Sequence, residues 1–329
     1  MPTKQEQERA REDITEVAPG VLRLQLPISM PGLGHVNCYA LTDKRGAALV
    51  DPGLPGPSSW KALRKRLSDA GLSPKAVHTV VVTHSHPDHF GSAGRLAKEA
   101  GADLVTHESF ELWWGQRDRR PSTTSWGGRR FRHGWRRRIG WALMRGVGHR
   151  IWAPPVPTKK VGDHGELELG GRRWVGLHTP GHTQDHLCLH DPDNGILLSG
   201  DHVLPTITPH IGGMGTAEDP LSDFFDSLDK VSAIDVDLVL PAHGHPFEDL
   251  SGRCKDIHDH HIERLERLVA AAESHGEATV ETLSHELFKP RHWGFMAESE
   301  TFAHLEHLRL AGRAERVDGP DGVWRYRVS

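Results

Sequence analysis

The residues best suited to chemistry stand close together, in the run Thr-His-Ser-His-Pro-Asp-His at positions 83–89. This run puts four strong metal-binding side chains into six positions, and it follows a β-branched stretch that predicts a buried strand. Because side chains alternate along a strand, His84 and His86 point the same way. The proline ends the strand, since it has no N–H for the ladder, and the next turn brings Asp88 and His89 to a second point nearby. The run therefore predicts ligands for two adjacent divalent metal ions.

Three further candidate ligands lie downstream, each in a turn that contains glycine or proline and follows an apolar strand. They are His182 after strand 173–177, Asp201 after strand 195–198, and His243 after strand 236–240. Asp51 ends an earlier strand in the same way. Because strand ends are rigid, they can deliver side chains from distant parts of the chain to one cleft.

These motifs resemble those of the metallo-β-lactamase superfamily, in which an HxHxDH run is followed by a single His, Asp and His in strand-end turns. The resemblance covers roughly residues 17–255, and the five-part signature is far more specific than an isolated HxH pair. It implies the following ligands: for one ion His84, His86 and His182; for a second Asp88, His89 and His243; and for both, as a bridge, Asp201. It also implies that Asp51 supports the ligands from beside the ions.

The resemblance further implies a binuclear metal centre that acts as a hydrolase. Two ions about 3.5–4 Å apart share a hydroxide, whose parent water then has a pKa near about 7. In this scheme Asp88 accepts the proton of the water and Asp201 keeps the ions at their spacing. Zinc is the expected metal, with manganese and iron as alternatives. The set with a bridging Asp resembles the glyoxalase II, lactonase, ribonuclease Z and β-lactamase-like protein 2 branches, so a β-lactam substrate is disfavoured.

The group that would protonate the leaving group stays open at this stage. His202 stands next to Asp201 and is a candidate proton shuttle, while His186 and His245 are weaker candidates. A structural role is favoured for each of the three. Tyr39 lies within an early strand and is expected in the core.

Composition limits the remaining choices. A chain of 329 residues suggests about two domains, and a net charge of −4 argues against a general nucleic-acid binder. The three cysteines are widely spaced, as in the reduced thiols of a cytoplasmic protein. No apolar run approaches the roughly 20 residues that span a bilayer, so stable membrane insertion is not expected. Residues 1–16 are polar and predict a flexible tail.

Residues 17–255 are expected to form an α/β catalytic domain, because short strands alternate with amphipathic helices. The expected strands before the ligand-rich turns are 21–26, 37–41, 47–51 and 78–83, with a further strand at 103–107. The expected helices are 59–70 and 90–100. The resemblance implies that these elements make an αββα sandwich.

An insertion at residues 113–153 breaks this pattern. It contains eleven arginines against one acidic residue, Asp118, together with six of the ten tryptophans. We interpret it as a lid in which Arg binds phosphate or carboxylate and Trp provides apolar walls. The alternatives are a helical insert with solvated Arg and packed Trp, or an element on a membrane surface.

Residues 256–329 predict three helices, at 261–274, 278–287 and 300–311, followed by a terminal hairpin. This order resembles a winged-helix module, and the β-lactamase-like protein 2 branch has a similar tail. The third helix carries Glu298, Glu300 and Glu306, which disfavours DNA binding and favours a cleft wall or a homodimer contact. The cluster at 258–261 is interpreted as a solvated helix start.

The expected substrate is a small ester, thioester or lactone with an anionic part. A single-strand endoribonuclease is the competing enzyme, in which the arginines would follow the RNA backbone and the tryptophans would stack on bases. A metal-bound regulatory or scaffold protein without catalysis is the third hypothesis.

Overall fold

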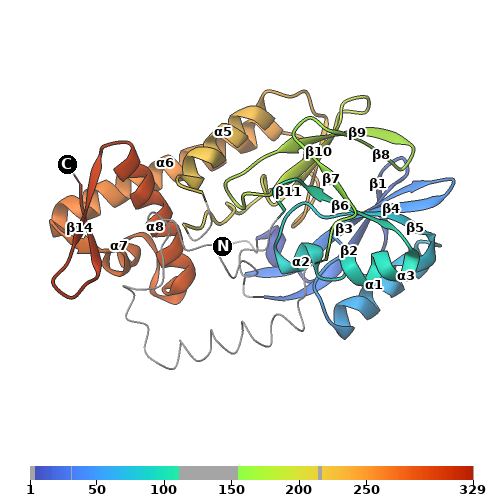
Figure 1. Cartoon of the computed structure of the whole chain (residues 1–329), viewed down its shortest axis with the longest axis horizontal. Helices are drawn as coiled ribbons and strands as arrows, with labels where there is room; N and C mark the ends of the chain where they lie inside the picture. Colours follow the sequence, from blue (N-terminus) through green and yellow to red (C-terminus); the bar gives the residue numbers. More distant parts are fainter. Residues whose placement is uncertain (1–3, 31, 111–154, 214–216, 329) are drawn as a thin grey trace.

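The computed structural model describes residues 4–30, 32–110, 155–213 and 217–328. Two sheets face each other in the larger body (Figure 1). The first has the order β1 (Thr15–Ala18), β2 (Val21–Met30), β3 (Leu33–Asp43), β4 (Gly46–Val50), β5 (Val77–Val81), β6 (Asp103–His107) and β7 (Lys159–Val161). The second has the order β12 (Leu238–Pro241), β11 (Ile196–Gly200), β10 (Leu187–Asp191), β9 (Arg172–His178) and β8 (Glu166–Leu169).

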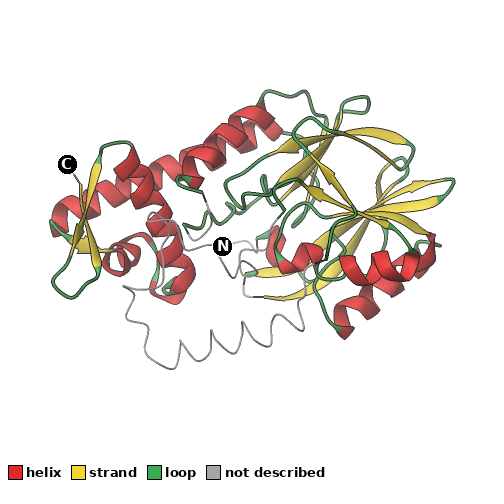
Figure 2. Ribbon diagram, viewed as in Figure 1, coloured by secondary structure: helices red, strands yellow, loops and turns green. Residues whose placement is uncertain are grey.

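The layers follow from where the apolar side chains lie. Trp174 and Leu189 of the second sheet pack with Val81 of the first in a core between the sheets. The outer face of the first sheet is covered by α1 (Pro57–Asp69) and α3 (Ala93–Ala100) (Figure 2). The outer face of the second is covered by α5 (Pro220–Ser232) and α6 (Leu250–His275). This arrangement is the predicted αββα sandwich.

The predicted strands are present, with most bounds within a few residues. The predicted helix 90–100 is instead two helices, α2 (Pro87–Phe90) and α3. They separate because the N–H of Ser92 donates to the carbonyl of Gly53 at 3.1 Å rather than to a helical carbonyl. The predicted lid, residues 113–153, lies wholly outside the described residues.

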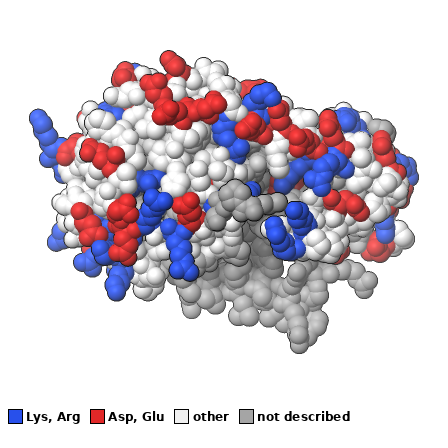
Figure 3. Space-filling model, turned by 180° about the vertical axis from the view of Figure 1, so that it is seen from behind, with Lys and Arg blue, Asp and Glu red and all other residues white. Residues whose placement is uncertain are grey.

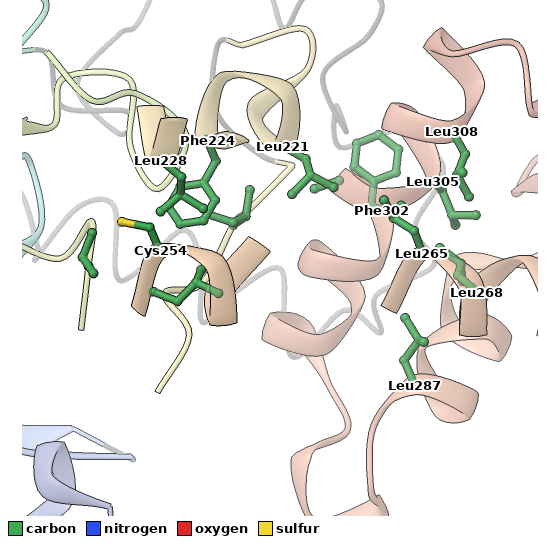
Figure 4. Close-up of a cluster of buried hydrophobic side chains, with 14 of the residues drawn as sticks. Leu221, Phe224, Leu228, Cys254, Leu265, Leu268, Leu287, Phe302, Leu305 and Leu308 are labelled. Atoms are coloured by element: carbon green, nitrogen blue, oxygen red, sulfur yellow. The ribbon is translucent and has the colours of Figure 1, made fainter. Parts of the chain in front are cut away.

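The smaller body contains, after α6, β13 (Ala278–Thr279), α7 (Val280–Leu287), η3 (Pro290–His292), α8 (Phe295–Leu310), β14 (Ala314–Asp318) and β15 (Trp324–Val328). Its helices and terminal hairpin follow the predicted order. Its core is continuous with that of the larger body, because Phe224 of α5, Leu265 of α6 and Phe302 of α8 belong to one buried cluster (Figure 4). The helix α6 runs through the predicted domain boundary at 255/256 and takes part in both bodies.

The predicted flexible tail is wrong for the described residues 4–16. Residues Gln5–Gln7 form the short helix η1, and Glu6 is fully buried. Its carboxylate accepts the N–H of Thr206 at 2.7 Å and the N–H of Ile207 at 3.1 Å. Burial of this charged group is tolerable because these donors satisfy it.

One prediction about polar side chains near the C-terminus is also wrong. The cluster at 258–261 is not a solvated helix start, because α6 begins at Leu250 and His261 is fully buried, with its Nδ1 3.1 Å from Nε2 of His304. The acidic residues Glu298, Glu300 and Glu306 of α8 are buried as well, so they form no exposed acidic face.

The described surface gives little sign of a dominant charge. Acidic and basic side chains are interspersed over the described part of the face in Figure 3. Among the helices of the described residues, none combines the length and the apolar character that crossing a bilayer requires. The cytoplasmic location stays a prediction.

Because the His261–His304 pair is buried, the stability of the protein should depend on pH. Burial lowers the pKa of both imidazoles, so the folded chain keeps them neutral while the unfolded chain binds protons below about pH 6.5. The free energy of unfolding should therefore fall as the pH drops below about 6.5, by up to about 1.4 kcal/mol per pH unit for each such histidine. In urea denaturation of the metal-free protein, His261→Gln should make this slope shallower. His258→Gln, at a partly exposed position of the same helix, should not, and equal slopes for all three proteins would contradict a neutral buried pair.

Candidate metal centre

The strand ends of both sheets meet at one edge of the sandwich and carry the candidate ligands. In the first sheet β4 and β5 run parallel, and in the second β11 and β12 do, so their carboxyl ends lie side by side. His84 and His86 follow β5, and α2 then places Asp88 and His89 in its single turn. The turns after the strands of the second sheet supply the ligands His182 (after β9), Asp201 (after β11) and His243 (after β12).

The first group of ligands is compact. Nδ1 of His86 lies 2.9 Å from Nε2 of His84 and 3.0 Å from Nε2 of His182. Oδ2 of Asp201 lies 3.6 Å from Nε2 of His182 and 3.9 Å from Nε2 of His84. These four ligand atoms all lie within 4.8 Å of one another, a spacing that one metal ion could span.

The second group lies against the first and shares Asp201 with it. Oδ2 of Asp88 lies 3.5 Å from Nε2 of His243 and 3.6 Å from Nε2 of His89. Oδ1 of Asp201 lies 3.2 Å from Nε2 of His243, while its Oδ2 lies 3.6 Å from Nε2 of His89. The structure thus brings all seven predicted ligands together, with Asp201 in reach of both groups, as a bridge requires.

The chemistry of the pocket fits divalent cations. Nε2 of His89, Nε2 of His243 and Oδ1 of Asp201 are buried and have no hydrogen-bond partner among the described residues, although a buried polar atom is costly without one. Burial lowers the pKa of His84 well below its usual value, which leaves its imidazole neutral, as a metal ligand must be. At His89 burial acts in the same direction, but the Asp201 and Asp88 carboxylates raise its pKa well above the usual value, so the pocket favours positive charge.

Hydrogen bonds from the far side of each ring fix which nitrogen faces the pocket. Nδ1 of His182 donates to the carbonyl of His210 at 2.7 Å, and Nδ1 of His243 donates to the carbonyl of His35 at 2.6 Å. Nδ1 of His89 donates to Oδ2 of Asp51 at 2.8 Å. In each ring Nε2 therefore faces the candidate metal position, an orientation that supporting contacts fix in metal sites.

Asp51 has the supporting position predicted for it. Besides His89, it accepts the Thr83 N–H at 2.9 Å and the Thr83 hydroxyl at 2.8 Å. Its backbone has a φ of 54°, in the left-handed region that residues other than glycine seldom adopt. Strain of this kind persists where the surroundings fix the residue, and here it lets one carboxylate bind both ends of the segment 83–89.

His186 and Gly200 support Asp201; the sequence favoured a structural role for His186 but did not identify its partner. Nε2 of His186 accepts the N–H of Asp201 at 3.0 Å, and its Nδ1 donates to the Thr179 hydroxyl at 2.8 Å. Gly200 has a φ of +53°, and a Cβ there would lie 2.5 Å from Nε2 of His186. A glycine before the bridging Asp thus lets the imidazole approach the backbone, and this glycine was the one signal that the sequence offered.

The structure packs two of the candidate proton shuttles, His202 and His245, against other residues. His202 is fully buried against Phe224, with ring centroids 5.0 Å apart, and burial lowers its pKa to about 3. Nε2 of His245 instead lies 3.0 Å from the Glu8 carboxylate. The Tyr39 hydroxyl donates to the carbonyl of Pro241 at 2.8 Å within the core, where Tyr39 was expected. These contacts give His202 and His245 structural roles.

Comparisons with known proteins agree with this architecture. Residues 31–243 match the family model described as "Metallo-beta-lactamase superfamily", and residues 265–329 match "Metallo-beta-lactamase-like, C-terminal domain". A metallo-beta-lactamase family protein from Thermus thermophilus is 31% identical with a TM-score of 0.78, over 95% of this chain and 100% of that one. A beta-lactamase domain protein from Burkholderia ambifaria is 29% identical with a TM-score of 0.83, over 98% and 96%. The beta-lactamase-like protein 2 homolog of Caenorhabditis elegans is 22% identical over 89% of this chain and 81% of its own.

Asp51 provides a test of how the ligands are supported. Asp51→Asn should lower the affinity for divalent metal by about 10- to 100-fold, because His89 loses the charged acceptor that sets its tautomer. Competition with a coloured chelator would measure this affinity. Asp191→Asn is the matched control. Asp191 is equally buried, but it pairs with Arg172 at the end of β10 that lies away from the candidate ligands. The same affinity in both variants would show that Asp51 does not act on the metal centre.

Proposed function

Because the chain belongs to the metallo-β-lactamase superfamily, we propose that it is a hydrolase with two divalent ions that cleaves an ester, thioester or lactone with an anionic part. The observation that carries this proposal is the position of Asp201, whose carboxylate lies within 4 Å of ligand nitrogens of both groups. A bridging carboxylate of this kind suits hydrolysis by a metal-activated water. Zinc is the proposed metal, since the site offers imidazole and carboxylate ligands.

The bound ions would supply an activated water at neutral pH and polarise the substrate oxygen. The protein side chains do the remaining work. Asp88 would hold an ion through the oxygen that faces His89 and His243, and we assign to its other oxygen the acceptance of the proton from water. Asp201 sets the spacing between the two ligand groups, and Asp51 keeps His89 in its ligating tautomer. Because the ligand atoms are buried, little bulk water would compete with the substrate.

The anionic part of the substrate is proposed on compositional grounds. The segment 113–153 contains eleven arginines, whose planar side chains suit phosphate and carboxylate, and six tryptophans, which suit an acyl or aromatic group. An acyl-CoA or acyl-glutathione type of thioester combines both features. We further propose a cytoplasmic enzyme whose C-terminal domain is winged-helix-like and forms a cleft wall or a homodimer contact.

Two substrates assayed side by side test the reaction class. Metal-quantified protein should hydrolyse members of an acyl-CoA thioester panel and leave a labelled single-stranded RNA intact. His84→Ala should lower turnover by roughly 10²–10³, on the scale of losing one group that stabilises charge in the transition state. His164→Ala, at an exposed histidine, should keep wild-type turnover.

The opposite result would identify the competing enzyme. RNA cleavage that is lost in His84→Ala and falls steeply with salt, with inert thioesters, would replace the ester proposal by an endoribonuclease. Full metal occupancy without turnover of either substrate would instead favour a regulatory or scaffold role.

A further inference from the structure

The loop of residues 204–213 stands directly behind the candidate ligand His182. Its His210 carbonyl accepts the Nδ1–H of His182 at 2.7 Å, and this bond decides that Nε2 faces the pocket. A backbone carbonyl has no side chain of its own to hold it in place. The direction of this acceptor therefore depends on how the loop is fixed.

The first half of the loop is fixed by two elements that lie far away in the sequence. Glu6 of the N-terminal segment accepts the backbone N–H of Thr206 and of Ile207. From the other side, Arg253 of α6 donates to the carbonyl of Leu204 at 2.6 Å and to the carbonyl of Ile207 at 2.7 Å. Residues 204–207 are thus held between a carboxylate and a guanidinium.

The second half of the loop is fixed by α8 of the C-terminal domain. Nδ1 of His210 donates to Oε2 of Glu300 at 3.3 Å, and the N–H of Gly213 donates to the carbonyl of Ser299 at 3.2 Å. Between these two bonds, Ile211 is fully buried in the same apolar cluster as Phe302. The residue that carries the acceptor for His182 is therefore anchored to α8 through its ring and through the residues that follow it.

We infer that Glu300 is a positioning residue for the metal centre: through the His210 ring it fixes the carbonyl that orients the ligand His182. The inference rests on the metal centre of the proposed function, but on no particular substrate. Glu300 is buried and also forms an ion pair with Arg264 of α6, so its carboxylate has a fixed direction. Without it, the His210 peptide can rotate, and the imidazole of His182 loses its single orientation.

The same carboxylate belongs to a third group of candidate ligands, His261, Glu300 and His304, whose ligand atoms lie within 4.8 Å of one another. The contacts of these three residues favour a structural hydrogen-bond network over a site for a third metal ion. Arg264 already supplies the positive charge beside Glu300. In the His304 ring, Nδ1 donates to the carbonyl of Glu300 at 2.7 Å and Nε2 accepts from His261 at 3.1 Å. A divalent ion would break these bonds and meet the Arg264 guanidinium.

Metal binding by four proteins tests this inference: wild type, Glu300→Ala, Glu300→Gln and His210→Ala. Metal content, chelator competition and the visible spectrum of the Co²⁺-substituted protein report on the ligands without any substrate. Glu300→Ala should weaken one of two bound ions by about 10- to 100-fold and alter the cobalt spectrum. Glu300→Gln should recover part of the affinity, because its amide oxygen can still accept a hydrogen bond. His210→Ala keeps the Arg264–Glu300 pair, so it should fold, and should give the same metal defect as Glu300→Ala.

Glu306→Ala is the matched control. Glu306 is as buried as Glu300 and lies on the same helix, but its partners are Arg309, Arg316 and Tyr326, away from the loop. The Glu306→Ala variant should be less stable than the wild type and should keep the wild-type affinity for metal. Two ions held with equal affinity in every variant would overturn the positioning role and leave the proposed function intact. A third ion in wild type that Glu300→Ala loses would overturn it in favour of a separate metal site, and a wild type that binds no divalent ion would overturn both proposals.

Discussion

Many imidazole and carboxylate groups are buried together in this protein, and each needs a hydrogen-bond partner or a cation. The rest of the structure depends on this constraint. Asp201 lies between two groups of ligands, and several nitrogens and oxygens there have no partner within the described parts of the chain. Such a pocket is stable only when each ring keeps one nitrogen free for a cation and binds a protein acceptor with the other. The acceptors come from Asp51 and from the carbonyls of His35 and His210. The ligand set therefore requires β3, β4 and the loop 204–213 to meet at one edge.

Meeting at one edge has a cost in backbone conformation. Asp51 adopts a positive φ so that one carboxylate reaches both Thr83 and His89, and Gly200 adopts one so that His186 can approach the peptide of Asp201. Asp51 follows β4 and Gly200 ends β11, and both line a small pocket between the two sheets. The strain at Asp51 is offset by the hydrogen bonds that it permits.

Features that depend on local sequence patterns were predicted, whereas features that depend on hydrogen bonds between residues far apart in the sequence were missed. The HxHxDH run and the strand-end turns carry the resemblance to the family, and that resemblance implied all seven candidate ligands and the sandwich. The burial of Glu6, His261 and Glu300 could not, because each is polar and each is accommodated by partners about 40 to 200 positions away. His35 and His210 act through backbone carbonyls, which carry no residue-specific signal. Polar composition predicted solvent exposure around Glu6 and His261, and long-range hydrogen bonds reversed it.

These long-range bonds change how the C-terminal domain is understood. An appended domain that only recruited a partner would need its own core and a hinge, whereas here α6 runs through both bodies and one apolar cluster extends from Leu197 of the second sheet to Tyr326 of β15. Removing α8 would expose Ile211 and Leu265, which pack in the same apolar cluster, and would release the loop that holds the acceptor for His182. The domain therefore stabilises the edge of the sandwich where the ligands converge, and stability and metal geometry are coupled through the same helix. A chain that kept the seven candidate ligands but lost this helix would retain the donor atoms. It would lose the contacts that orient the His182 ring.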